Sequence, residues 1–205
     1  MDSGHQIMRP AGSKDDIHIE WRVAIACWCA RHASHLAGDF VECGTNTGIV
    51  SLAICEYLDF NNINKTFWLF DTFNGIPREQ ISRKEAKAGR GNENAEWYPE
   101  CFELAVSNFK PYPRARLVRG KVPDTLSTVE IDKVSYLHLD MNIAYPERAA
   151  LEYFWPMMPT GAIALLDDYG WSSYLEQKKI LDEFAASKGV EIFMLPTGQG
   201  LLLRT

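Results

Sequence analysis

The chain has 205 residues, of which 46% are hydrophobic and 23% are charged, and its formal net charge at pH 7 is −6. This length and composition predict a single globular domain that can bury a sizeable core. The negative net charge argues against nucleic acid as the main partner, because phosphate binding needs a basic field. The sequence contains no apolar stretch of about 18 residues, so a membrane-spanning helix is not expected.

The cysteines and the first residues bear on the compartment. The five cysteines, an odd number, include no Cys-x-x-Cys pair, which predicts free thiols in a reducing, cytoplasmic compartment. The polar segment 1–14 lacks the apolar stretch of a signal peptide and is expected to be flexible or to act as a lid. The main domain is therefore expected over residues 15–205.

The first predicted element is a helix over residues 15–36. Apolar residues recur there at three- and four-residue steps, with Trp21, Ile25 and Trp28 among them. This apolar face can bury against a sheet of the same chain or against a second subunit. A homodimer is therefore one expectation.

Strands and helices then alternate along the chain. In chain order the predicted elements are strand 39–43, helix 47–58, strand 66–70, helix 98–109, strands 116–118 and 133–139, helix 146–155, strand 161–166, helix 171–187 and strands 191–195 and 201–204. The polar segment 78–97 is expected to be an insertion, as a substrate loop or lid. The alternation predicts an α/β fold with a doubly wound, mostly parallel seven-stranded sheet and an antiparallel C-terminal hairpin.

The loop after the first predicted strand has the composition of a nucleotide-cofactor site. Gly44 permits a sharp turn and a close approach of the backbone to a ligand, and Gly48 does the same where the next helix begins. Glu42 can accept hydrogen bonds from an ammonium group, and Thr45 and Asn46 lie between the glycines. A plain strand–turn–helix connection explains the same spacing, so the loop alone leaves both interpretations open.

Asp71 ends the second predicted strand, about 27 residues after Gly44. A carboxylate there can bind both hydroxyls of a ribose, although turn capping is an alternative role. A dinucleotide site would have a glycine near the pyrophosphate, where this chain has Asn46. The pattern therefore favours a cofactor that contains adenosine but places no diphosphate at this turn.

Three carboxylates follow neighbouring strands of the predicted sheet. Asp140 follows the fourth strand, and Asp167 and Asp168 follow the fifth. Because acids at one rim repel each other, they predict a raised pKa or a bound cation such as Mg²⁺, to which Asn142 can add a neutral oxygen. Such an ion could lower the pKa of a substrate hydroxyl. The alternative is that Asp167 and Asp168 cap the next helix and that Asp140 accepts backbone N–H groups.

Several blocks of the sequence resemble, in the same order, those of the macrocin and mycinamicin O-methyltransferases. They are Phe40 to Gly44 (FVECG), Phe67 to Pro77 (FWLFDTFNGIP), Val118 to Leu126 (VRGKVPDTL), Leu137 to Asp140 (LHLD) and Leu165 to Gly170 (LLDDYG). The resemblance extends from about Phe40 to Gly170.

The resemblance implies a Rossmann-like methyltransferase fold, S-adenosylmethionine as methyl donor, and Mg²⁺-assisted O-methylation of a sugar hydroxyl. Carried over by position, Glu42 to Gly48 face the methionine part of the donor. Asp71, with Thr72 beside it, faces the ribose. Gly120 and Lys121 lie in the adenine region. The metal positions fall on Asp140, Asp167 and Asp168.

One position departs from the family pattern. The family has a second acid two residues after the first, where this chain has Asn142, which cannot act as a general base. Either Asp140 serves as both metal ligand and base, or the metal and base are altered or absent. The expected partner is a small hydroxyl acceptor, a carbohydrate in the first instance. A nicotinamide-dependent oxidoreductase and a non-catalytic S-adenosylmethionine-binding module remain as alternatives.

Overall fold

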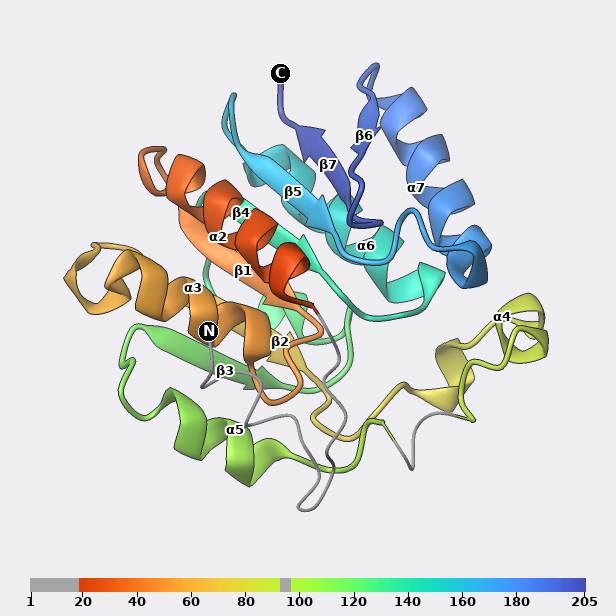
Figure 1. Ribbon diagram of the computed structural model, residues 1–205, viewed down its shortest axis with the longest axis horizontal. Helices are drawn as coiled ribbons and strands as arrows, with labels where there is room; N and C mark the ends of the chain where they lie inside the picture. Colours follow the sequence, from red (N-terminus) through yellow and green to blue (C-terminus); the bar gives the residue numbers. More distant parts are fainter. Residues whose placement is uncertain (1–18, 93–96) are drawn as a thin grey trace.

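The computed structural model describes residues 19–92 and 97–205, so the predicted lid over residues 1–14 lies outside the described residues. At its centre is a seven-stranded sheet with the order β3-β2-β1-β4-β5-β7-β6 (Figure 1). The strands are β1 (Asp39–Cys43), β2 (Phe67–Asp71), β3 (Ala115–Arg119), β4 (Val134–Leu139), β5 (Ile163–Leu166), β6 (Ile192–Met194) and β7 (Gly200–Leu203).

Strands β1 to β5 pair in parallel, and β7 runs antiparallel to both β5 and β6. The predicted fold class, including the C-terminal hairpin, is therefore confirmed. The chain continues from β1 to β2 on one side and returns to β4 on the other. In open sheets of this kind, ligands bind outside the carboxyl ends of the strands at such a reversal.

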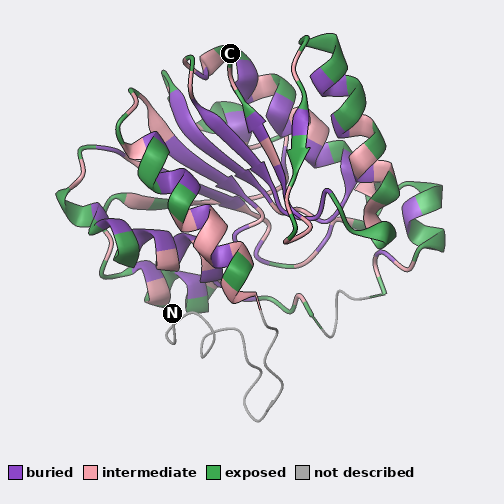
Figure 2. Cartoon of the chain, turned by 45° about the horizontal axis from the view of Figure 1, so that its top comes forward, coloured by how far each residue is buried: buried purple, intermediate pink, exposed green. Residues whose placement is uncertain are grey.

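Helices cover both faces of the sheet. Helices α2 (Glu20–Ser34), α3 (Ile49–Leu58) and α5 (Phe102–Phe109) pack on one face, and α6 (Ala144–Phe154) and α7 (Leu175–Ser187) on the other (Figure 1). Strand side chains alternate between the two cores: Phe40 packs with α2 and α3, whereas Val41 packs with the α6 side. Figure 2 shows the central strands buried between these two layers.

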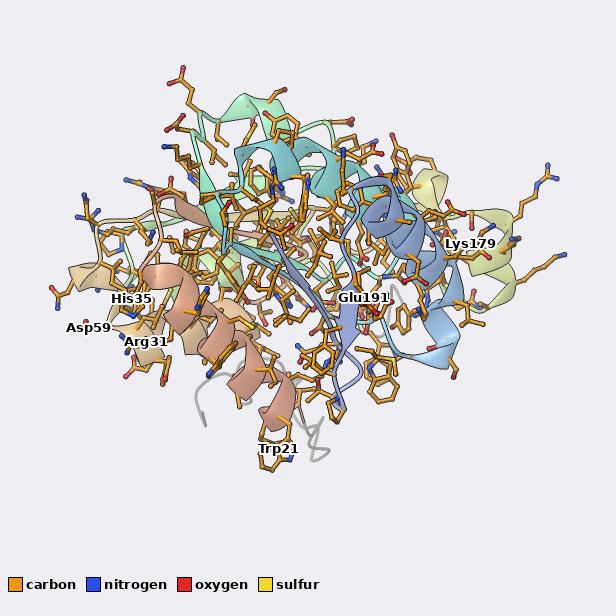
Figure 3. The ribbon with its side chains drawn as sticks, turned by 90° about the horizontal axis from the view of Figure 1, so that it is seen from above. Trp21, Arg31, His35, Asp59, Lys179 and Glu191 are labelled. Carbon is orange, nitrogen blue, oxygen red and sulfur yellow. The ribbon has the colours of Figure 1, made fainter. Side chains whose placement is uncertain are left out.

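The face that α2 turns to the sheet is not the predicted one. Trp21 and Trp28 are 77% and 61% exposed, and the buried residues of the helix are Val23, Ala26, Cys29, Ala30 and Ala33. Small side chains bring the helix axis close to the sheet and leave no room beneath it for an indole. Figure 3 shows Trp21 at one end of α2, pointing away from the body of the molecule. Burial of this face against the sheet is therefore ruled out, and its burial against a second subunit stays a prediction.

The predicted insertion 78–97 contains a short helix, α4 (Arg83–Lys87), rather than loop alone. Ser82 and Glu85 form a reciprocal capping box at its start. The other carboxylate oxygen of Glu85 accepts a hydrogen bond from the backbone N–H of Ala144 at 2.7 Å, which anchors α4 to the start of α6. The insertion is thus attached to the fold near the cavity described below.

Two expectations about the compartment can be compared with the structure. None of the helices within residues 19–92 and 97–205 has the length and apolar composition needed to cross a membrane. All five cysteines are free thiols, as the sequence predicts.

Candidate functional site

A cavity of about 340 Å³ opens at the carboxyl ends of the parallel strands. Its wall is built from the loops that follow β1, β2, β4 and β5, from the first turn of α2, and from residues 97–101. Cavities of a few hundred Å³ at this edge of an α/β sheet are the usual places for small ligands and cofactors. Most of the predicted site residues line it.

The loop after β1 requires both of its glycines. Gly44 has a φ of +96°, and a Cβ atom there would lie 1.9 Å from the carbonyl oxygen of Asp140. Gly48, with a φ of +99°, precedes α3, and its Cβ would lie 2.5 Å from the ring of Phe109. Gly44 lines the cavity, whereas Gly48 lets α3 pack against α5. The sequence predicts a close approach of the Gly44 backbone to a ligand. In the structure Gly44 lies close to the backbone of Asp140, directly after β4.

Asp71 binds the loops around it. One carboxylate oxygen accepts a hydrogen bond from the backbone N–H of Asn46 at 2.7 Å, and the other accepts one from the N–H of Phe73 at 2.6 Å. The hydroxyl of Thr72 lies 3.3 Å from the same carboxylate. Burial raises the pKa of Asp71 despite these donors. Asp71 therefore combines the turn-capping role with a place on the cavity wall.

The cavity wall beside Gly44 contains buried acceptors that the fold leaves unused. Within the described part of the chain, Glu42 Oε2 and Thr45 Oγ1 are buried without a hydrogen-bond partner, and both residues line the cavity. Polar groups are rarely buried unpaired, so such atoms indicate a polar ligand. An ammonium donor such as that of the methionine part of S-adenosylmethionine fits this pair of oxygens, so the residues present fit that cofactor.

The two residues predicted near an adenine ring are directed differently. Gly120 lines the cavity and donates its N–H to the carbonyl of Asp71 at 2.8 Å. Lys121 instead turns to the surface, where its Nζ forms an ion pair with Glu79 at 2.7 Å. Lys121 is not among the residues that line the cavity, and its place beside an adenine ring stays a prediction.

Asp140, Asp167 and Asp168 meet at one rim, as the strand positions predict. Burial and the neighbouring acids raise the pKa of Asp140 well above its ordinary value and that of Asp168 to about 6. Burial alone would raise the pKa of Asp167, but His138 and Arg22 hold it below its ordinary value. Asp167 and Asp168 do not cap a helix here, because neither the 3-10 turn Ser172–Tyr174 nor α7 that follows it has a side-chain hydrogen bond at its N-cap.

The residues present do not fit the predicted Mg²⁺ ion. Mg²⁺ needs octahedral oxygen ligands at about 2.1 Å. Here one Asp167 oxygen contacts the Arg22 guanidinium, and the other accepts a hydrogen bond from Gln199 at 2.9 Å. Arg22 also donates to Asp168 Oδ1 at 3.0 Å. Among the described residues, no group of three or more His, Cys, Asp or Glu side chains is arranged to hold a metal ion.

Comparison with known proteins gives this site a family. A model of the family described as Macrocin-O-methyltransferase (TylF) matches residues 26–195. The chain belongs to the macrocin-O-methyltransferase family. Demethyldecarbamoylnovobiocin O-methyltransferase of Streptomyces niveus is 27% identical over 149 residues, covering 66% of this chain and 54% of that protein. Mycinamicin III 3''-O-methyltransferase of Micromonospora griseorubida is 26% identical over 145 residues, covering 64% and 55%. The chain thus spans about half the length of these curated relatives.

Solved structures agree on the fold. The O-methyltransferase NovP superposes with a TM-score of 0.80 at 24% identity, covering 100% of this chain and 88% of that one. The calicheamicin methyltransferase CalS11 superposes with a TM-score of 0.70 at 16% identity, covering 91% and 80%. At these identities the comparison confirms the fold that this chain shares with methyltransferases.

Asn142, where the resemblance implies an acid, takes part in a network with two tyrosines. Its φ is +64°, and its Oδ1 accepts hydrogen bonds from Tyr174 at 2.9 Å and from Tyr98 at 3.4 Å. All three residues line the cavity. Asn142 therefore joins segments that are far apart in sequence, and its amide Nδ2 lies 3.5 Å from Asp140 Oδ1.

Three charged or titratable residues at or near the rim are candidates for function that the sequence analysis does not identify. Arg22 reaches the rim from a helix 145 residues away from Asp167 along the chain, and nothing in its local sequence signals this. His138, on β4, has Nδ1 2.9 Å from Glu42 Oε1 and Nε2 3.5 Å from Asp167 Oδ1. Burial alone would lower the pKa of His138, but these two carboxylates raise it to about 10. Glu147 is buried behind the rim, and burial raises its pKa to about 8.

Proposed function

We propose that the chain is an S-adenosylmethionine-dependent O-methyltransferase that acts on a hydroxyl group of a small molecule, a carbohydrate in the first instance. One observation carries the proposal: a single cavity joins a turn with unused buried acceptors to a rim of three carboxylates. The first part suits a cationic nucleoside donor, and the second suits a hydroxyl that must lose its proton. The family match and the names of the curated relatives support this assignment.

The donor half of the cavity is formed by the loops after β1 and β2. Glu42 and Thr45 offer acceptors to an ammonium group, and Asp71 offers its remaining lone pairs to ribose hydroxyls. When bound, S-adenosylmethionine supplies a methyl group whose carbon–sulfur bond breaks, with its electron pair, toward the positively charged sulfur. The acidic wall favours such a cationic ligand electrostatically.

The acceptor half contains the base. As the acceptor oxygen forms its bond to the methyl carbon, its proton must pass to a nearby group, and we assign this role to Asp140. The raised pKa of Asp140 makes its ionised form a stronger base than an exposed carboxylate. The main task of the other residues is to hold the acceptor in line, since methyl transfer depends largely on orientation. Asn142 and Tyr174 also line the cavity, and we assign them to its acceptor half.

Donor binding can be tested by calorimetry with S-adenosylhomocysteine. We expect the wild-type protein to bind, and Asp71→Asn to bind at least about tenfold more weakly, because a hydrogen bond to a charged group contributes about 1.5–3 kcal/mol. Asp39→Asn is the matched control: Asp39 also accepts from a backbone N–H and a side chain, but at the opposite end of β1. Equal affinities for Asp71→Asn and wild type would remove Asp71 from the donor site.

Turnover separates this function from its alternatives. The family match favours methyl transfer over nicotinamide chemistry, and a fluorescence titration with NADH should show no saturable binding. Formation of S-adenosylhomocysteine with at least one member of a panel of glycosides would exclude a non-catalytic binding module. If the donor binds but no acceptor in a broad panel is methylated, the result favours a non-catalytic binding module, which agrees with Asn142 being unable to act as a general base. The free thiols support the further proposal of a cytoplasmic location.

A further inference from the structure

The guanidinium of Arg22 contacts two of the three acids at the rim, Asp167 and Asp168. Its Nη2 donates to the backbone carbonyl of Asp167 at 2.8 Å and to Asp168 Oδ1 at 3.0 Å, and it also contacts the Asp167 carboxylate. The side chain of Arg22 is 19% exposed, and those of the two acids are 7% exposed. A partly buried cation thus contacts both of the carboxylates that the sequence predicts as metal ligands.

The neighbours of Arg22 fix it in this place. Both oxygens of Asp167 are engaged, one by Arg22 and the other by Gln199 at 2.9 Å. Gln199 also lies 3.5 Å from the carbonyl oxygen of Arg22, so the same amide faces both partners. Removal of one partner of a buried ion pair leaves the other charge uncompensated. Asp167 and Asp168 therefore need compensating positive charge. The chain supplies Arg22 from α2 to both acids, and the His138 imidazole lies 3.5 Å from the other oxygen of Asp167.

The guanidinium of Arg22 also has an N–H donor that no described residue uses. Arg22 Nε is buried and has no hydrogen-bond partner within residues 19–92 and 97–205, and Arg22 lines the cavity together with Asp140 and Asp168. A guanidinium has five N–H donors and stays charged at every physiological pH. It can therefore stabilise negative charge on an acceptor oxygen by donating a hydrogen bond, without any metal ligand.

We propose that Arg22 is the resident cation of the acceptor site and that the methyl transfer catalysed by this chain requires no divalent metal ion. The inference rests on the proposed function for its chemical step. In that step the C–O bond forms, the C–S electron pair returns to sulfur, and the hydroxyl proton passes to Asp140. Arg22 stabilises the oxygen while its proton leaves. Any divalent ion would have to displace this guanidinium from Asp167 and Asp168.

Binding of Mn²⁺, followed by electron paramagnetic resonance, tests the proposal without an acceptor. We expect no saturable binding to the wild-type protein. Arg22→Ala frees two carboxylates at the rim and should bind Mn²⁺ saturably, with an affinity at least about tenfold above the upper limit measured for the wild type, a difference of about 1.4 kcal/mol. The double variant Arg22→Ala, Asp168→Asn should lose the gained binding. Stoichiometric binding of Mn²⁺ to the wild-type protein, or no gain in Arg22→Ala, would overturn the assignment.

Arg31→Ala is the matched control, because it removes the same charge from the other end of α2, far from Trp21 and its neighbour Arg22 (Figure 3). It should leave Mn²⁺ binding as in the wild type. If Arg22→Ala does not fold, the wild-type measurement still decides, and Arg22→Gln provides a larger neutral replacement. S-adenosylhomocysteine binding is measured on the same samples. Its absence would defeat the proposed function, whereas the Mn²⁺ result judges the resident cation separately.

Where turnover is obtained, resistance to chelation is the second measurement. Wild-type methyl transfer should continue unchanged in excess EDTA, whereas Arg22→Ala should lose activity and recover part of it on addition of Mn²⁺ or Mg²⁺. A merely structural role for Arg22 predicts loss without rescue. Loss of wild-type activity in EDTA, restored by Mg²⁺, would contradict the proposal.

Discussion

Substitution of Gly44 by alanine should lower the free energy of unfolding by more than its left-handed backbone conformation alone would cost, and it should also distort the cavity wall. The new Cβ would lie 1.9 Å from the carbonyl oxygen of Asp140, whereas carbon and oxygen atoms approach to about 3.3 Å at closest. The ends of β1 and β4 would have to separate by more than about 1 Å. The hydrogen bond from Asp140 N–H to the carbonyl of Cys43, 2.8 Å long, lies at the same point and would be stretched or broken.

Gly89→Ala isolates the backbone contribution. Gly89 has a φ of +99°, close to the +96° of Gly44, but a Cβ atom there meets nothing within 4 Å. Left-handed backbone costs an L-residue about 1–2 kcal/mol, and this should be the whole effect at Gly89. Overpacking adds about 1–3 kcal/mol at Gly44. The expected free energies of unfolding therefore differ by about 2 kcal/mol between the two variants.

Urea denaturation and calorimetry with S-adenosylhomocysteine measure the two consequences. Gly89→Ala should bind the ligand like the wild type. Gly44→Ala should bind at least about tenfold more weakly, a loss of about 1.4 kcal/mol, because the wall that carries Glu42 and Thr45 moves. If the two variants agree in stability within about 0.5 kcal/mol and bind equally well, the close approach of β1 and β4 does not shape the donor site.

Three further outcomes follow from buried groups. Glu147 has a pKa of about 8 in the folded protein, above its ordinary value of 4.5, so wild-type stability should fall as the pH rises from about 4.5 to about 8 and then level off. Glu147→Gln should gain about 2 kcal/mol relative to wild type between pH 6 and pH 8 in urea titrations. Glu42→Gln should lower the pKa of His138 from about 10, measured by NMR of the imidazole, and an unchanged value would show that Asp167 alone sets it. Gly48→Ala should cost at least about 1 kcal/mol less in a Phe109→Ala background, because the ring that its Cβ would strike is gone, and additive costs would refute that clash.

The fold is predictable here because its signals are local. Each central strand is a short apolar run followed by a polar or glycine residue, and this pattern survives whatever packs on the sheet. The exception is α2, where Trp21 and Trp28 suggest a buried face that the structure gives to Ala26, Ala30 and Ala33. Periodicity counts apolar residues but does not show which side allows the closest approach to the sheet.

The site is predictable only in part, for a related reason. Residues at strand ends, such as Asp71 and Asp140, are placed by topology, which the sequence pattern contains. Arg22 contacts Asp167, which lies 145 residues away along the chain, and only the packing of α2 on the sheet brings the two together. The helix α4 could have been found, because Ser82-Arg83-Lys84-Glu85 has the spacing of a capping box.

The line of contacts from Glu42 through His138 to Asp167 crosses three adjacent strands, β1, β4 and β5. It connects the proposed donor half of the cavity, at Glu42, with the acidic rim of the acceptor half, at Asp167. A substitution at Glu42 that alters the proposed donor site would also lower the pKa of the His138 imidazole, which lies 3.5 Å from the acid that Arg22 contacts. Substitutions that alter the proposed acceptor site without disturbing this line of contacts are therefore expected in the peripheral segments around the cavity, such as residues 97–101 and the loop before α7.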